Sequence, residues 1–107
     1  MCSSDLLLRV AKKKGALCIG VDADQWGTLP EAHPCLVTSA MKLITKGVAD
    51  VIATDVNGTW KGGNNFGSVG LAPYHDFSKK VPAAIQAKVA ALTPKVMSGA
   101  VKTGVKL

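Results

Sequence analysis

Hydrophobic residues in this chain alternate between short continuous runs and longer segments with helical spacing. The runs at residues 16–21 and 35–38 predict two strands, and we expect the first to be buried on both faces, as in a parallel sheet. The sequence between them contains Gly27, Pro30 and Pro34, which predicts a loop. Strands that alternate with helical segments are typical of an α/β layer architecture.

The first two helical segments have recognisable ends. An amphipathic helix precedes the first strand and ends at Lys12–Lys14, with Gly15 as its C-cap. After the second strand, Ser39 can cap a helix whose apolar residues recur at intervals of three and four. We expect this second helix to run to about Asp55 and to end at Asn57-Gly58.

The last third of the chain holds a glycine-rich segment and a third helix. We expect one or two short strands within residues 65–71. Val81-Pro82 opens the helix, and Pro94 should break or kink it after Leu92, because proline has no backbone N–H. Residues 100–107 predict a terminal strand.

Size and charge narrow the classes of protein that remain. A chain of 107 residues predicts one small domain. The formal net charge is +6, but Arg9 is the only arginine, and the lysines are scattered without interleaved aromatic residues. Base readout favours arginine, and single-strand binding favours stacking rings, so we expect no nucleic-acid partner.

The three cysteines, Cys2, Cys18 and Cys35, have no metal-binding spacing, so a zinc site is not expected. Buried thiols are the default for Cys18 and Cys35, and a disulfide between them requires an oxidising compartment. The sequence contains no apolar run of membrane-spanning length and no visible signal peptide.

The stretch GVDADQ places Asp22 and Asp24 at the end of the first predicted strand. Such a pair can hold Mg²⁺, although the further acids of such a site are missing, because Asp50 and Asp55 fall inside a helix. An acid at a strand end can also bind the hydroxyls of a sugar. A dinucleotide site of this kind is not expected, because no GxGxxG precedes the pair. Capping of the loop is the remaining alternative.

Lys42 in TSAMK follows the second predicted strand as Asp22 follows the first. If the two strands are adjacent and parallel, both side chains reach the same edge, where a carboxylate and an ammonium can clamp a diol. The alternative is an exposed lysine on the first helical turn. His33 and His75 have no nucleophile at a recognisable spacing, so no catalytic residue is predicted.

The order of motifs AKKKG, IGVDADQ, LVTSAMK, GTWKGGNNFG and VGLA resembles the C-terminal part of the basic membrane protein family. These are substrate-binding proteins of ABC transporters, and purine-nucleoside-binding lipoproteins are one branch. The similarity covers residues 7–107. Residues 1–6 do not resemble the family, and we interpret them as a non-native or truncated leader.

The resemblance implies a fragment of a type I periplasmic-binding fold, in which parallel strands flanked by helices form two lobes around a ligand cleft. The chain would contain pieces of both lobes and lack most of the first. It would cross between lobes near TSAMK and return through the glycine-rich segment.

The resemblance also implies a function without catalysis, metal or cofactor. Asp22 and Lys42 would hold the ribose hydroxyls of a nucleoside, with Gly20, Val21 and Ser39 close by, while Asp24 stabilises the loop. The full-length protein would be extracytoplasmic and membrane-anchored through a lipid that this chain lacks, and would deliver ligand to permease subunits.

Two alternatives remain at this point. One is a small Mg²⁺-dependent α/β hydrolase that uses Asp22 and Asp24. The other is a member of the same family that binds riboflavin or a sugar.

Overall fold

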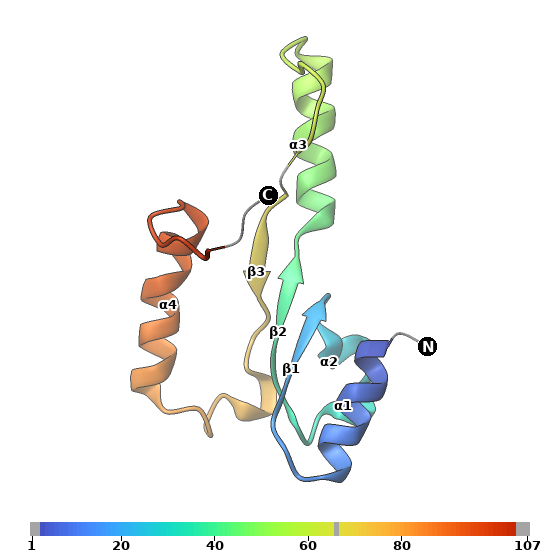
Figure 1. Cartoon of the computed structure of the whole chain (residues 1–107), viewed down its shortest axis with the longest axis vertical. Helices are drawn as coiled ribbons and strands as arrows, with labels where there is room; N and C mark the ends of the chain where they lie inside the picture. The colour runs from blue at the N-terminus through green and yellow to red at the C-terminus, as the bar shows by residue number, and fades with distance from the viewer. Residues whose placement is uncertain (1–2, 66, 105–107) are drawn as a thin grey trace.

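A three-stranded sheet connects the elements of this chain (Figure 1). The computed structural model describes residues 3–65 and 67–104. The architecture is mixed α/β, as predicted. In chain order the elements are α1 (Ser3–Lys13), β1 (Cys18–Asp22), α2 (Gln25–Thr28), β2 (Leu36–Lys42), α3 (Ile44–Val56), β3 (Val69–Leu71) and α4 (Ala83–Met97), with short 3-10 helices at Pro30–Ala32 and His75–Phe77.

The sheet has the order β1-β2-β3 and is not all-parallel. β1 and β2 pair in parallel, as expected, with Val21 opposite Ala40 and Asp22 opposite Met41. β3 pairs antiparallel with β2, so the expectation of parallel strands is wrong for this strand. β2 leads outward into α3, and the chain returns from the far end of that helix, so β3 enters the sheet in the opposite direction (Figure 1).

The core lies on one face of the sheet, where α1 and α2 pack. Its buried members are small or medium apolar side chains: Leu8, Cys18, Leu29, Ala32, Cys35 and Leu36. On the opposite face of β1, Ile19 is 64% exposed and Val21 is 44% exposed. The prediction of a strand buried on both faces is therefore wrong, because no described layer covers this second face closely.

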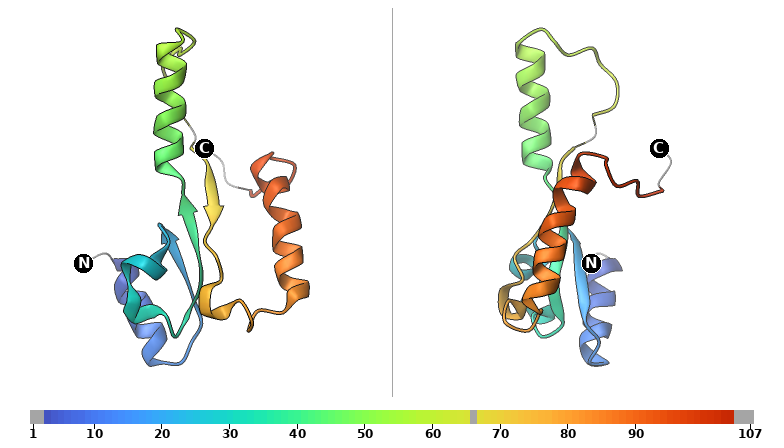
Figure 2. Two further views of the ribbon diagram at one scale, coloured as in Figure 1. Left: turned by 180° about the vertical axis from the view of Figure 1, so that it is seen from behind. Right: turned by 90° about the vertical axis from the view of Figure 1, so that its left-hand side faces the viewer.

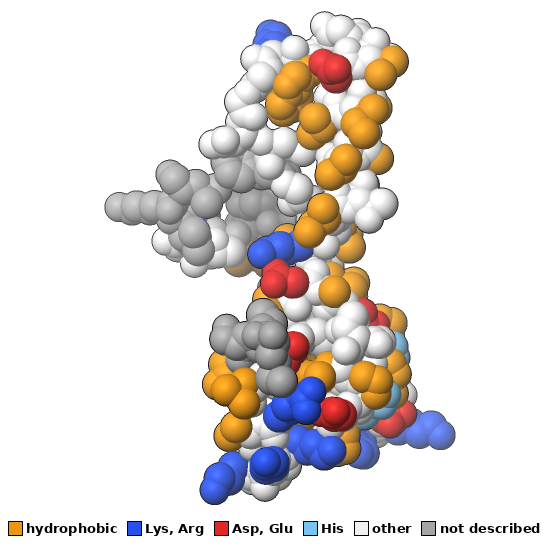
Figure 3. All heavy atoms as spheres, turned by 90° about the vertical axis from the view of Figure 1, so that its right-hand side faces the viewer, with side chains coloured by type: hydrophobic (Ala, Val, Ile, Leu, Met, Phe, Trp, Pro, Cys, Tyr) orange, Lys and Arg blue, Asp and Glu red, His pale blue; other side chains and the backbone are white. Residues whose placement is uncertain are grey.

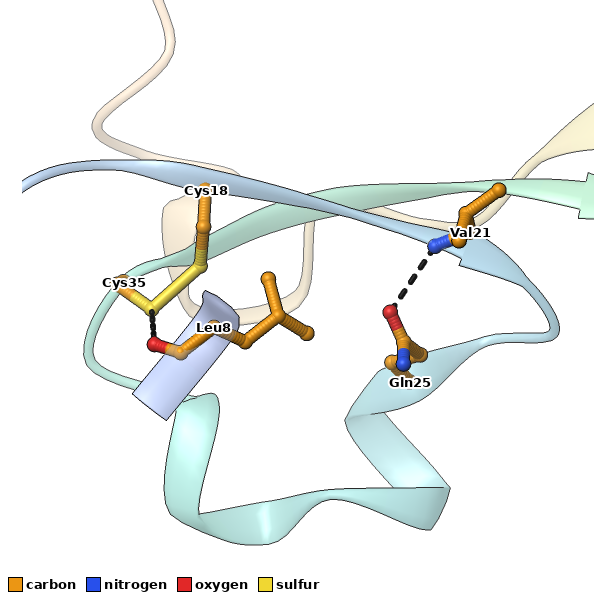
Figure 4. Close-up of a disulfide and its surroundings, with 5 residues drawn as sticks. All are labelled: Leu8, Cys18, Val21, Gln25 and Cys35. Atoms are coloured by element: carbon orange, nitrogen blue, oxygen red, sulfur yellow. Dashed lines mark hydrogen bonds between the residues drawn. A yellow bond between two sulfur atoms is a disulfide. The ribbon is translucent and has the colours of Figure 1, made fainter. Parts of the chain in front are cut away.

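A disulfide joins the start of β1 to the residue before β2 (Figure 4). Cys18 and Cys35 lie with their Cα atoms 5.3 Å apart, and both are buried. The Sγ atom of Cys35 lies 3.6 Å from the carbonyl oxygen of Leu8. This is a packing contact, because a disulfide sulfur carries no hydrogen to donate. The open question of the pairing is thus answered in favour of a disulfide.

The second strand continues where the sequence predicts a helix. Ser39 is no helix cap: it lies inside β2, fully buried, and Met41 also belongs to the strand. The helical spacing at Met41 is overridden because Ala40 and Met41 pair with strands on both sides. α3 begins only at Ile44 and ends at Val56, with Asn57 as its C-cap, close to the expected end.

α4 runs through Pro94 without the predicted break. Proline removes the hydrogen bond to the Ala90 carbonyl, but Ala90 is exposed, so water can satisfy this oxygen. The hydroxyl of Thr93, the residue before the proline, donates to the Val89 carbonyl at 2.9 Å. The helix closes at Ser98-Gly99, with Gly99 at φ +74°.

α3 projects away from the sheet and gives the molecule its elongated shape, 51 × 35 × 25 Å (Figures 1 and 2). Hydrophobic side chains follow its length in the space-filling view (Figure 3). A stripe at intervals of four, made of Ile44, Val48, Ile52 and Val56, is 52–80% exposed. Among the described residues, no helix is long and apolar enough to cross a membrane.

The two ends of the chain agree only in part with expectation. α1 ends at Lys13 and Gly15 has φ +66°, as predicted. Residues 3–6 of the expected leader belong to α1, and residues 1–2 lie outside the described residues, so the origin of this segment stays a prediction. Residues 100–104 form no strand, so the predicted terminal strand is wrong for this part of the chain. Residues 105–107 of that prediction lie outside the described residues.

Gly20 is required by close packing. A Cβ at this position would lie 2.5 Å from both Gln25 Oε1 and Ser39 Oγ. We predict that Gly20→Ala lowers the free energy of unfolding by about 1–3 kcal/mol, the usual cost of overpacking. Urea denaturation measures this cost. Gly27→Ala is the control, because nothing lies within 4 Å of its added Cβ; equal stability of both variants would contradict the packing argument.

The disulfide should stabilise the fold by restricting the unfolded chain. Cys18 and Cys35 are 17 residues apart in sequence, and closing a loop of this size contributes about 3 kcal/mol. We expect reductant to lower the urea midpoint of the wild-type chain accordingly. The double variant Cys18→Ala/Cys35→Ala should show no response to reductant, and an unchanged wild-type midpoint would argue against the bond.

Candidate functional site

The carboxyl ends of β1 and β2 bring Asp22 and Lys42 together, as the sequence predicts for adjacent parallel strands. The Lys42 Nζ atom donates to Asp22 Oδ1 at 2.7 Å. Both side chains face solvent, with exposed fractions of 64% for Lys42 and 56% for Asp22. Lys42 ends a strand and does not lie on the first helical turn, which was the alternative placement. The pair is therefore preassembled and accessible to a ligand.

Asp22 has an unusual backbone conformation. Its φ is +74°, in the left-handed region where aspartate is one of the few non-glycine residues that occur with any frequency. The Ala23 N–H donates to the Val21 carbonyl at 3.0 Å, so the chain turns sharply at Asp22. This turn ends the strand and directs the Asp22 carboxylate toward Lys42. Strained backbone of this kind concentrates at functional sites.

The ion pair changes the titration of Lys42. The hydrogen bond to Asp22 and the negative charge of its carboxylate raise the pKa of Lys42 above its ordinary value of 10.5, and desolvation opposes them only weakly. At neutral pH the site therefore contains one carboxylate acceptor and one ammonium donor. Such a pair can bind adjacent hydroxyls, which both donate and accept hydrogen bonds.

The other three predicted site residues lie around the pair without joining it. Gly20 and Ser39 lie on the buried face toward α2, and the Ser39 Oγ accepts a hydrogen bond from the Gln25 N–H at 3.1 Å. From this buried face, their contacts support the strands that carry Asp22 and Lys42. Val21 lies on the opposite face and lines a groove of about 500 Å³ between the sheet and α4, which Lys42 also borders.

The groove is almost entirely apolar. From the sheet it is lined by residues such as Ala40 and Leu71, and from α4 by the helix stripe that includes Val89, Leu92 and Val96. These are the side chains that a helix presents to a sheet when the two layers pack. None of the residues of α4 is buried, so this helix faces the sheet across the groove without closing over it.

Asp24 differs from Asp22 in its role. Its Oδ1 accepts from the Trp26 N–H at 3.1 Å and caps α2, so the prediction that Asp24 stabilises the loop is confirmed. Its Oδ2 lies 2.9 Å from His75 Nε2. The two carboxylates of GVDADQ thus engage different partners. The described residues contain no group of three or more His, Cys, Asp or Glu side chains that could hold a metal ion.

The sequence did not predict the stack of aromatic rings beside Asp24. Trp26 stacks on His33 with ring centroids 3.5 Å apart and on His75 at 4.6 Å. The His33 Nε2 atom also lies 2.8 Å from the Trp26 carbonyl oxygen. The partner of His75 is Asp24 and not the adjacent Asp76. No local signal links His75 to Asp24, because 51 residues separate them.

No known protein-family model matches this sequence, and a search of curated proteins finds no significant match.

The link between Asp22 and Lys42 predicts a specific titration. Asp22→Asn removes the charge and should return the pKa of Lys42 to about 10.5. Because the folded-state pKa of Lys42 is raised, the stability linked to this shift is present at neutral pH, begins to fall near pH 10.5 and is lost as pH rises through the folded pKa. NMR titration of the Lys42 side chain measures the change.

Lys46 and Asp50 supply the control. They form another exposed ion pair, with 2.5 Å between Nζ and Oδ2. Asp50→Asn should leave the titration of Lys42 unchanged. If Asp22→Asn also leaves it unchanged, the pair does not exist in solution.

Proposed function

We propose that this chain is part of an extracytoplasmic solute-binding protein of an ABC transporter that binds purine nucleosides through their ribose hydroxyls. The observation that carries the proposal is the Asp22–Lys42 pair at the carboxyl ends of two adjacent parallel strands. Ligands of open α/β sheets bind at this edge. The pair is exposed and offers both an acceptor and a donor for a diol.

The course of the chain beyond the site supports the same proposal. β2 leads directly into α3, which leaves the sheet, and the chain returns to β3 (Figure 2). A two-lobe fold of the type I periplasmic-binding class needs such a crossing and return. The exposed stripe on α3, from Ile44 to Val56, would then pack on a first lobe.

The proposed protein binds and releases without chemistry. In the intact form two lobes would close on the nucleoside by a hinge movement, and permease subunits would accept the ligand. This chain offers one side of that cleft, and its affinity for a nucleoside alone should therefore be weak.

The alternative of a Mg²⁺-dependent hydrolase requires both carboxylates of GVDADQ on one ion. Asp22 is paired with Lys42, and Asp24 is used by Trp26 and His75. No observation favours this alternative. A riboflavin- or sugar-binding member of the same family would use the same pair, because ribityl chains and sugars also carry adjacent hydroxyls.

Binding of inosine to the 107-residue chain tests the proposal. We expect inosine to perturb the side-chain NMR signals of Lys42 with a dissociation constant of about 1 mM or weaker, because only half the cleft is present. The analogue 2′,3′-dideoxyinosine, which lacks both ribose hydroxyls, should cause no such change.

Two outcomes of this titration would count against the proposal. Equal perturbation by the dideoxy analogue would show that the hydroxyls are not recognised. Sub-micromolar affinity of this chain would contradict the half-cleft, because one side would then be sufficient.

A further inference from the structure

Gln25 is a buried polar residue that the site described above does not use directly. It is only 6% exposed, yet it forms hydrogen bonds to three separate segments, and Figure 4 shows the one to Val21. Its Oε1 accepts from the Val21 N–H at 2.9 Å, and its Nε2 donates to Asp5 Oδ1 at 3.1 Å. Its own N–H donates to Ser39 Oγ. A buried amide with this many partners is costly to lose, because each partner would be left unsatisfied.

The bond to Gln25 satisfies a backbone N–H at the edge of the sheet. β1 lies at the edge of the sheet, with β2 as its one neighbour among the described residues. In a wider sheet, the Val21 N–H would donate to a carbonyl of the next strand, whereas here it donates to the Gln25 side chain. The Val21 carbonyl accepts from the Ala23 N–H. Both polar groups of Val21 are thus fixed by the turn that follows.

Asp22 lies inside this closed turn. The side-chain bond from Val21 to Gln25 spans four residues and encloses the position with φ +74°. Gly20 leaves the space that the Gln25 amide occupies, because a Cβ there would lie 2.5 Å from Oε1. The conformation that directs Asp22 toward Lys42 is therefore held from the buried side of the strand.

We propose that Gln25 is a positioning residue that holds the Asp22 carboxylate on Lys42 through the Val21 N–H. The inference deepens the proposed function, because it names what orients the diol-binding pair, but its primary test needs no ligand.

The test compares variants of the whole chain by the NMR titration of Lys42. Gln25→Met keeps the volume of the side chain and removes the acceptor, so the pKa of Lys42 should fall toward 10.5. The double variant Gln25→Glu/Asp5→Asn restores an acceptor for Val21 and exchanges donor and acceptor toward residue 5. We expect this double variant to restore the raised pKa, which a loss of packing alone would not explain.

Asp5→Ala is the matched control. It removes the partner of the Gln25 Nε2 atom and leaves the bond to Val21 in place. Stability should fall, while the pKa of Lys42 stays raised. If Asp5→Ala lowers this pKa as much as Gln25→Met does, or if Gln25→Met leaves it raised, the proposal is wrong.

A backbone change keeps the test available if Gln25→Met does not fold. An ester in place of the Gly20–Val21 amide removes the Val21 N–H and leaves every side chain intact. It should lower the pKa of Lys42 as Gln25→Met does, and an unchanged value would overturn the proposal.

Inosine binding separates this inference from the proposed function. If wild type binds inosine, Gln25→Met should weaken binding by about tenfold or more, the loss expected for one charge-assisted hydrogen bond. A fall in the pKa of Lys42 without any inosine binding by wild type would support the positioning role and contradict the function. Inosine binding with an unaltered pKa in Gln25→Met would do the reverse.

Discussion

The parallel pairing of β1 with β2 is the constraint on which the other features of this chain depend. It aligns the ends of the two strands, so that Asp22 and Lys42 meet although 20 positions separate them in the sequence. The same alignment brings Cys18 and Cys35 within bonding distance at the opposite end. A slip by one residue would turn the side chains of a strand to the other face and separate the pair. The covalent link at one end therefore helps to fix the register at the other.

Polar and covalent contacts supplement a small core. Among the described residues, the buried apolar cluster on the α1 side of the sheet has six members. Ser39 and Gln25 extend the order of this face toward the strand ends through hydrogen bonds that are shielded from water. Shielded hydrogen bonds specify one arrangement because unmade partners are costly. The exposed ion pair contributes little to stability by comparison, which leaves Asp22 and Lys42 available for a ligand.

Sequence reasoning succeeded where local signals and global packing agree. Gly15 and Asn57-Gly58 mark helix ends by their own chemistry, and the apolar run before Asp22 marks a strand. It failed where tertiary contacts override the local pattern. Met41 fits a helical period but pairs with strands on both sides.

The part of the site that could be predicted depended on a rule of sheet geometry: side chains at the ends of parallel neighbours lie together. The part that could not be predicted depends on single long-range contacts. His75 reaches Asp24 across 51 residues, and no period or motif records that contact. Nothing in the sequence distinguishes Gln25 from an ordinary polar loop residue either, because its three partners lie in other segments of the chain.

Our central proposal is recognition of the hydroxyl side of a nucleoside by a preassembled carboxylate–ammonium pair. Saturation-transfer difference NMR with inosine tests this statement directly, because the method reports which ligand protons touch the protein even when binding is weak. Recognition through the hydroxyls predicts the strongest transfer to the ribose 2′ and 3′ protons, and its loss in Asp22→Asn/Lys42→Met. Strongest transfer to the base protons that persists in this double variant would contradict it.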